Sequence, residues 1–149
     1  MKSAFCLATC LALLAACSPG IADDKKETKL DPAKLVGTWK YVSGEKDGQK
    51  LDKDHLKDQT VIITKETITL KGEQTFVMKY ELDQKKKPVA VKLTMTESPF
   101  GAGAKADGVI ELDGDELKFC YAPMGGEAPK KFEAKEGSKL HFFVLKRSK

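Results

Sequence analysis

Hydrophobic and polar residues alternate with a period of two along most of the chain after Leu35. The segment 76–82 shows this clearly, because apolar side chains stand at Phe76, Met78, Tyr80 and Leu82. The same pattern recurs in shorter or longer form at 60–64, 68–70, 89–95, 110–112, 117–121 and 140–144. A period of two is typical of half-buried β-strands and not of helices. The pattern therefore predicts a chain of short strands.

Residues that favour turns separate these predicted strands. The turn segments are Lys71-Gly72-Glu73, residues 84–88, Asp113-Gly114-Asp115 and Glu136-Gly137-Ser138. Evenly spaced strands joined by tight turns predict an antiparallel meander. Closure of about eight such strands removes the sheet edges that promote aggregation. We therefore expect an all-β fold, an antiparallel up-and-down barrel.

Two segments do not fit a strand. Asp31 can cap a helix whose first residue is Pro32, which predicts a short N-terminal helical turn placed to plug one barrel end. Residues 52–58, with Leu56 as the main apolar residue, are expected to form either a brief helix or a loop.

The N-terminus has the pattern of an export signal. An apolar run from Ala4 to Ala16 follows Lys2 and is too short to span a bilayer. It ends in Leu14-Ala15-Ala16-Cys17, which resembles the lipobox of bacterial lipoproteins. This predicts a signal peptide at 1–16, a lipidated N-terminus and tether at 17–30, and a barrel domain at 31–149.

Lipidation at Cys17 predicts an exported protein held by its acyl chains on the periplasmic or outer-surface face of a bacterial membrane. The alternative is a plain secretory signal cut after Ala22, which would leave the protein soluble in the periplasm or secreted. Under either interpretation Cys120 is the one thiol left to the folded domain, so no disulfide is expected there.

The charge pattern argues against a nucleic-acid partner. The formal net charge is +4, and Arg147 is the only arginine among 26 basic residues. Nucleic-acid readers favour arginine, whose planar fork bonds phosphates and bases. The lysine runs at 25–26 and 85–87 are interpreted as solvated, with weak attraction to anionic lipid or cell-wall polymer as the alternative.

No catalytic constellation was found, and we expect neither an enzyme nor a cofactor. The chain lacks a Gly-x-Ser-x-Gly elbow and a His-Glu-x-x-His motif, and His55 and His141 are its only histidines. Alternation with Phe142 places His141 on the outer face of the last predicted strand. Cys120 is expected to be buried, under the residues that follow its strand, and inert.

Two further motifs are interpreted as loops. Asp113 to Glu116 offers oxygen ligands, but Asp-Gly between apolar runs favours a hairpin turn over a calcium site, and no metal is expected. The glycine-rich segment 101–108 has no helix after it to complete a phosphate site. Together with Ser98-Pro99-Phe100 it is expected to form a loop at the open end of the barrel, where it could gate access.

The first predicted strand carries Gly37-Thr38-Trp39 directly after the helical turn. This resembles the first signature of lipocalins, in which the glycine permits close contact between helix and strand and the tryptophan closes the barrel floor. The resemblance implies that Arg147, at the end of the last strand, stacks over Trp39. These two residues are the expected barrel-closing pair.

A wider set of residues resembles an uncharacterised planctomycete domain family, a lipocalin-like set common on exported proteins. The set covers the chain from about residue 34 to its end and consists of Gly37-Thr38-Trp39, Leu112-Asp113-Gly114-Asp115 with Leu117, Cys120, Ala122-Pro123, Pro129, Phe132 and Val144 to Arg147. The resemblance implies a lipocalin-like fold and an exported location, and no activity. The second lipocalin signature is missing, and Met124-Gly125-Gly126 stands where a Pro-Gly turn is expected.

The predicted interior is apolar. Its candidate ligand-lining residues are Phe76, Met78, Tyr80, Val91, Leu93, Phe119, Tyr121 and Phe142. An eight-stranded barrel either holds one small ligand or is filled by its own side chains. The leading hypothesis is a membrane-anchored barrel that binds a small apolar or amphipathic molecule or an envelope component. The alternative is a solid barrel that acts as a structural or protein-interaction module.

Overall fold

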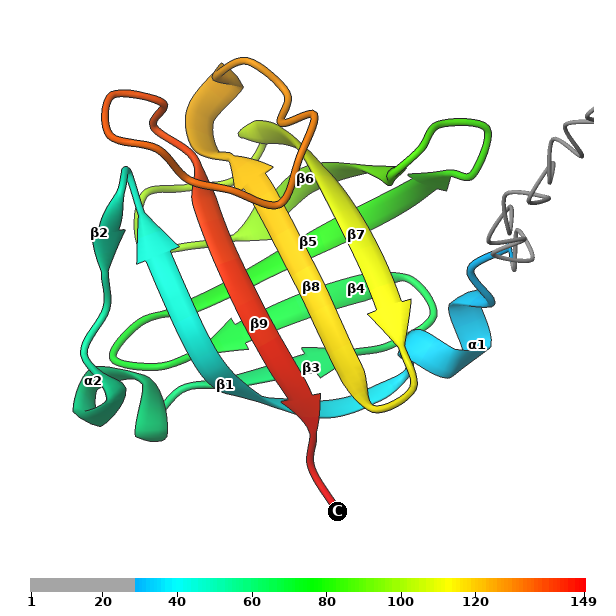
Figure 1. Ribbon diagram of the computed structural model, residues 1–149, viewed down its shortest axis with the longest axis horizontal. Helices are drawn as coiled ribbons and strands as arrows, with labels where there is room; N and C mark the ends of the chain where they lie inside the picture. The colour runs from blue at the N-terminus through cyan, green and yellow to red at the C-terminus, as the bar shows by residue number, and fades with distance from the viewer. Residues whose placement is uncertain (1–28) are drawn as a thin grey trace, which may run out of the picture.

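A computed structural model of the chain describes residues 29–149 (Figure 1). The predicted signal peptide and Cys17 lie outside these residues. The described residues form three short helices, α1 (Pro32–Leu35), α2 (Lys53–Lys57) and the 3-10 helix η1 (Pro123–Gly125). Their strands are β1 (Gly37–Lys46), β2 (Gln49–Lys50), β3 (Thr60–Ile63), β4 (Thr67–Lys71), β5 (Thr75–Asp83), β6 (Val89–Glu97), β7 (Lys105–Asp113), β8 (Glu116–Ala122) and β9 (His141–Arg147).

Within residues 29–149, eight of these strands close an antiparallel barrel. From β3 onward each strand pairs with the next in the chain, β3 also pairs with β1, and β9 returns to pair with β1. The short strand β2 only extends the end of β1. In Figure 1, β1, β9, β8 and β7 cross in front of β3 to β6. The predicted all-β, up-and-down barrel is confirmed.

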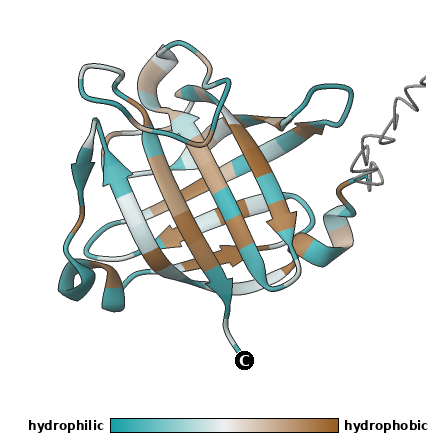
Figure 2. Ribbon diagram, in the orientation of Figure 1, coloured by the Kyte–Doolittle hydropathy of each residue, from teal (hydrophilic) through white to brown (hydrophobic). Residues whose placement is uncertain are grey.

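Side chains that alternate along the strands form the core of the barrel. Figure 2 shows polar and apolar residues alternating along the strands. Along β5 and β6 the residues predicted to point inward, among them Met78, Tyr80, Val91 and Leu93, are buried in the core. The predicted faces of these two strands are therefore confirmed.

The strand β1 contains a bulge that its hydrophobic pattern does not predict. Its pairing with β9 shifts between Tyr41 and Ser43, which leaves Val42 48% exposed. A bulge inserts one extra residue and changes the side-chain alternation beyond it. Beyond the bulge Gly44 stands opposite Phe143, and a Cβ atom on Gly44 would lie 2.8 Å from the Phe143 ring. Glycine at this position makes room for the aromatic ring.

The inward face of β9 differs by one residue from the prediction. Phe119 pairs with Phe143, and Tyr121 pairs with His141, so these four side chains share the inner face. Phe142 therefore points outward, and its predicted place in the interior was wrong. The expectation that His141 points outward was wrong for the same reason.

The outer face of β7 to β9 is also partly buried. Val109, Cys120 and Phe142 are in register across it. The connection between β8 and β9 folds back over this face, and Phe132 packs against Phe142 with ring centroids 6.2 Å apart. Cys120 is fully buried beneath it. An apolar outer face explains why hydrophobicity alone did not identify the inner face of β9.

The helix α1 plugs one end of the barrel, as predicted. The Asp31 carboxylate accepts a hydrogen bond from the Ala33 amide at 3.0 Å and so caps the helix. Leu35 is fully buried against the core. Leu30 is also buried there, which corrects its assignment to the tether. The folded part of the chain therefore includes Leu30.

Arg147 and Trp39 meet at this closed end. The guanidinium carbon of Arg147 lies 4.3 Å from the centroid of the Trp39 ring. The same guanidinium donates hydrogen bonds to the carbonyls of Val36, at 3.0 Å, and Lys34. The indole Nε1 of Trp39 donates to the carbonyl of Leu35 at 2.9 Å. One cation thus joins the last strand, the first strand and the plug helix.

Candidate functional site

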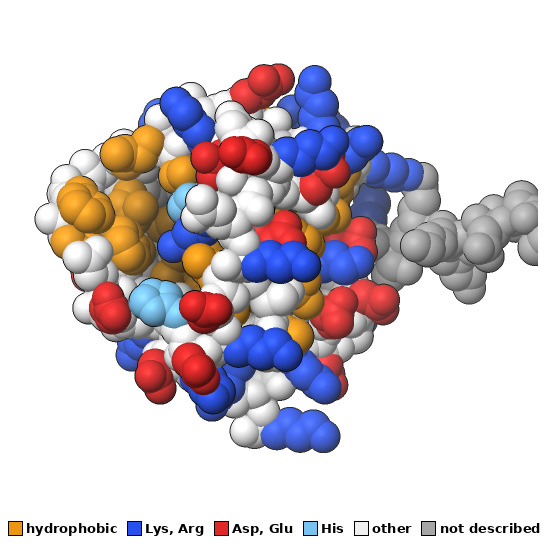
Figure 3. Space-filling view, turned by 60° about the vertical axis from the view of Figure 1, so that its left-hand side comes forward, with side chains coloured by type: hydrophobic (Ala, Val, Ile, Leu, Met, Phe, Trp, Pro, Cys, Tyr) orange, Lys and Arg blue, Asp and Glu red, His pale blue; other side chains and the backbone are white. Residues whose placement is uncertain are grey.

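A cavity of about 600 Å³ opens at the end of the barrel opposite α1. Four connections surround this mouth: β1 to β3, β4 to β5, β6 to β7, and β8 to β9. Figure 3 shows hydrophobic side chains gathered around a hollow on this face. The apolar and aromatic residues that line the cavity include Tyr41, Leu70, Phe76, Met78, Leu93, Met95, Ala106, Tyr121 and Phe143.

The predicted lining residues divide into two groups along the barrel axis. Phe76, Met78, Leu93 and Tyr121 line the cavity. Tyr80, Val91 and Phe119 do not line it and belong to the filled core. Phe142 belongs to neither group, because it lies on the outer face of β9.

The barrel is therefore filled at one end and hollow at the other. Trp39 and Leu35 fill the closed end. The Tyr80 hydroxyl donates a hydrogen bond to the Thr64 carbonyl at 2.8 Å, on the turn between β3 and β4 at this end. Sequence alone left a hollow and a filled interior as alternatives, and the structure contains both. The cavity opens at the mouth.

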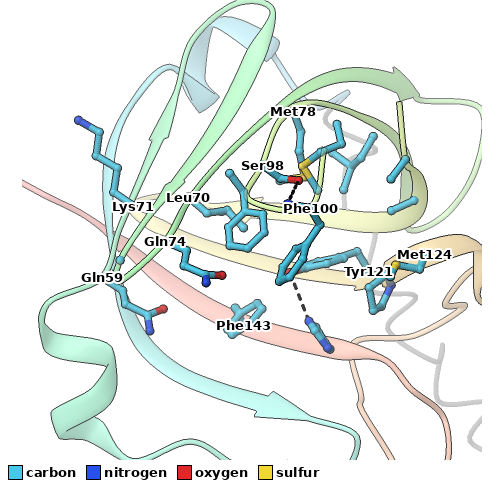
Figure 4. A pocket seen from close by; sticks show the side chains of 18 of the residues that line it. Gln59, Leu70, Lys71, Gln74, Met78, Ser98, Phe100, Tyr121, Met124 and Phe143 are labelled. Carbon is cyan, nitrogen blue, oxygen red and sulfur yellow. Dashed lines mark hydrogen bonds between the residues drawn. The ribbon is translucent and has the colours of Figure 1, made fainter. Parts of the chain in front are cut away.

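The connection between β6 and β7 lies at the mouth, where the sequence placed it. Phe100 is 80% exposed, yet its ring centroid lies 6.4 Å from that of Phe76 on the cavity wall. Ser98 holds the turn: its hydroxyl accepts from the Phe100 amide at 3.1 Å and donates to the Gly101 carbonyl at 2.6 Å (Figure 4). The loop thus presents an aromatic ring at the entrance.

His141 and Tyr121 form a polar pair in the cavity wall. Nδ1 of His141 lies 3.3 Å from the Tyr121 hydroxyl, a contact drawn as a dashed line in Figure 4. Burial and, to a smaller extent, the positive charge of Lys46 lower the pKa of His141 to about 4, although Asp47 opposes the shift. Burial also raises the pKa of Tyr121. Both side chains are therefore neutral at pH 7.

The polar residues of the rim were not predicted. Lys46 ends β1, Gln59 precedes β3, and Lys71 and Gln74 flank the turn between β4 and β5. They come from three separate parts of the sequence, and each of these parts has the pattern of an ordinary solvated turn. Only closure of the barrel brings these segments together, so no local sequence signal could have identified the rim.

Cys120 and His141 are not assembled as a catalytic dyad. They sit on opposite faces of the barrel wall, because Cys120 pairs with the outward Phe142 and Tyr121 pairs with His141. The Cys120 thiol donates to the Glu133 carbonyl at 3.7 Å. Burial raises the pKa of this thiol to about 11. A neutral thiol with no access to the cavity is a poor nucleophile.

Residues 29–149 hold neither a metal cluster nor a membrane-spanning helix. This part of the chain contains no cluster of three or more His, Cys, Asp or Glu side chains placed to hold a metal ion. It also contains no helix of the length and apolarity needed to cross a membrane.

The described structure defines a class: a closed eight-stranded up-and-down barrel that fits a lipocalin-like fold and has an apolar cavity at its mouth. No protein-family model, no curated protein and no solved structure matches the chain. The resemblance to the planctomycete family therefore stays a prediction.

Proposed function

We propose that this protein is a non-enzymatic binding barrel that holds a small apolar or amphipathic molecule in the cavity at its mouth. The observation that carries this proposal is the cavity itself, since about 600 Å³ is within the range of small-molecule sites. Its aromatic and aliphatic wall suits an apolar ligand. The few polar groups, such as Tyr121 and His141, can orient one.

A solid structural barrel is the weaker candidate. Such a barrel would fill both ends with its own side chains, as Trp39 and Leu35 fill the closed end here. A large cavity costs stability because its lining atoms lose packing partners, so its presence needs an explanation that a solid structural barrel does not supply. An unfilled apolar mouth supports binding.

The proposed location is the surface of a membrane outside the cytoplasm, through acylation of Cys17. The support is the tetrapeptide that ends at Cys17 and the apolar run before it. Mass analysis of the mature N-terminus tests this: acyl mass on Cys17, abolished by Cys17→Ala, is expected. An unmodified mature N-terminus at Asp23 would contradict it.

Binding of the neutral fluorescent probe N-phenyl-1-naphthylamine tests the cavity. We expect its emission to rise on titration into the protein, with saturation at one site. Leu93→Trp places a large ring in the cavity and should weaken probe binding at least about tenfold by filling the site. Thr94→Trp is the matched control, because Thr94 is the next residue of β6 and is exposed on the outer face.

Two results would count against the proposal. The first is the absence of saturable probe binding by the unmodified protein. The second is an equal loss of binding in Leu93→Trp and Thr94→Trp, which would place the probe outside the cavity. Circular dichroism of both variants checks that the barrel is intact.

A further inference from the structure

The rim of the mouth has two chemically different sides. On one side lie the connection between β6 and β7 and the helix η1, which present Phe100 and Met124, respectively 80% and 82% exposed. On the other side, the neighbouring strands β9, β1, β3, β4 and β5 present polar groups at the same level. A ligand that enters between them meets an apolar wall on one side and a polar wall on the other.

The polar side carries hydrogen-bonding amides. Gln59 and Gln74 line the cavity from neighbouring connections, and Figure 4 shows both amide groups on the side of the mouth where β3, β4 and β5 begin or end. Primary amides donate as well as accept hydrogen bonds. They can therefore bind a polar head group while the apolar part of a ligand lies deeper, against Met78 and Phe143.

The charge on this side is set by Lys46. It stands directly across from His141 in the pairing of β1 with β9. Its positive charge contributes to the lowered pKa of the His141 ring in the cavity wall. Within residues 29–149, Lys46 makes no ion pair. The neighbouring Asp47 carboxylate is engaged elsewhere, because it accepts a hydrogen bond from the Lys139 amide at 2.8 Å.

Lys71 and the carboxylate Glu73 also line the rim on this side, and Lys105, the first residue of β7, lines it on the apolar side. The ammonium of Lys71 extends away from the cavity (Figure 4). His141 is neutral, so lysine charges exceed carboxylate charges at the entrance. Charges near a low-dielectric surface interact more strongly than charges in bulk water.

We infer that the ligand is an amphipathic anion, bound with its apolar body in the cavity and its negatively charged head group beside Lys46, Gln59 and Gln74. This inference rests on the proposed function and names the class of its ligand. It also assigns an orientation, since the polar donors at the closed end, on Trp39, Tyr80 and Arg147, already bond to backbone carbonyls of the chain.

Three probes with the same tail and different heads test the inference: dodecanoate, dodecanol and dodecyltrimethylammonium, each below its micelle concentration. Each is titrated against the protein with bound N-phenyl-1-naphthylamine, and displacement gives its affinity. We expect dodecanoate to bind most tightly and dodecyltrimethylammonium most weakly. Added salt should reduce the difference in affinity between these two probes, because it screens partly exposed charges.

Charge variants test the assigned residues. Lys46→Gln should weaken the binding of dodecanoate about two- to fivefold, the range expected for one partly exposed ion pair. The affinity for dodecanol should stay unchanged. Lys71→Gln should have a smaller effect, because its ammonium points away. Glu73→Gln should strengthen the binding of dodecanoate, because it removes a negative charge from the rim. The matched control is Lys40→Gln, an exposed lysine of the same strand β1 that does not line the cavity.

The outcomes separate this inference from the proposed function. Equal binding of all three alkyl probes, or preference for the cationic one, would overturn the anionic ligand and leave the binding barrel standing. Equal effects of Lys46→Gln and Lys40→Gln would overturn the assigned orientation. Failure of every probe to bind would overturn both proposals together.

Discussion

A Cβ atom on Gly37 would lie 2.8 Å from Nη1 of Arg147, although the two residues stand at opposite ends of the folded domain's sequence. Gly37 also adopts a φ of +146°, which side chains rarely allow. We expect Gly37→Ala to lower the free energy of unfolding by about 1–3 kcal/mol, through backbone strain and displacement of the guanidinium. Urea denaturation measures this.

The control for Gly37 is Gly101→Ala. Gly101 also has a positive φ, but a Cβ atom there would meet nothing within 4 Å. Its substitution should therefore show the cost of the backbone conformation alone. If the two variants lose equal stability, the close approach of Arg147 contributes nothing to the requirement for glycine.

Arg147→Ala should lower the free energy of unfolding by about 1–3 kcal/mol, since it removes both the stacking on Trp39 and the bonds to two carbonyls of the plug. Arg147→Lys should recover little, because an ammonium cannot stack and reach both carbonyls at once. Lys146→Ala, an exposed neighbour on β9, is the control. If Arg147→Lys retained the full free energy of unfolding, the positive charge alone would explain the contribution of Arg147.

Acid should destabilise the protein through His141. Its pKa of about 4 in the folded protein lies below 6.5, so the unfolded chain takes up this proton first as the pH falls. The free energy of unfolding should therefore decrease between pH 6.5 and 4 and lose no more from this group below pH 4. His141→Phe should flatten that dependence in urea titrations across this range.

Cys120 should react slowly with iodoacetamide at pH 7.5 in the folded protein and rapidly in denaturant, because its thiol is buried and its pKa is raised to about 11. Peptide mass analysis follows position 120 separately from other thiols. Phe132→Ser should speed the native reaction by loosening the cover over β8, whereas Phe100→Ser, at the mouth, should not. Rapid native labelling of the unmodified protein would refute the buried assignment.

The sequence predicted the strands best where only one face is apolar. In β5 and β6, Lys79, Glu81 and Lys92 identify the solvent face, so the positions between them had to be the interior. In β9, four apolar residues follow one another from Phe142 to Leu145, and a period of two then fits either face. The outer apolar residues are explained only by the covering connection.

Only the deep, apolar part of the candidate site could be predicted from the sequence. Phe76 and Met78 reveal themselves by alternation, which is a local property. The positions of Lys46, Gln59 and Gln74 at the rim depend instead on which connections meet at one end of the barrel. The bulge after Tyr41 also decides which side chains of β1 point into the cavity. Neither fact is encoded in a short stretch of sequence.

The closed end gathers Trp39, Arg147 and the plug helix, whereas the mouth is built from connections that contribute little to the core. Changes at the two ends are therefore nearly independent, because distant substitutions add their effects on stability. The mouth can accept new side chains, and even insertions, while the barrel still folds. This makes the domain a suitable scaffold for evolving or engineering new ligand specificities from one stable foundation.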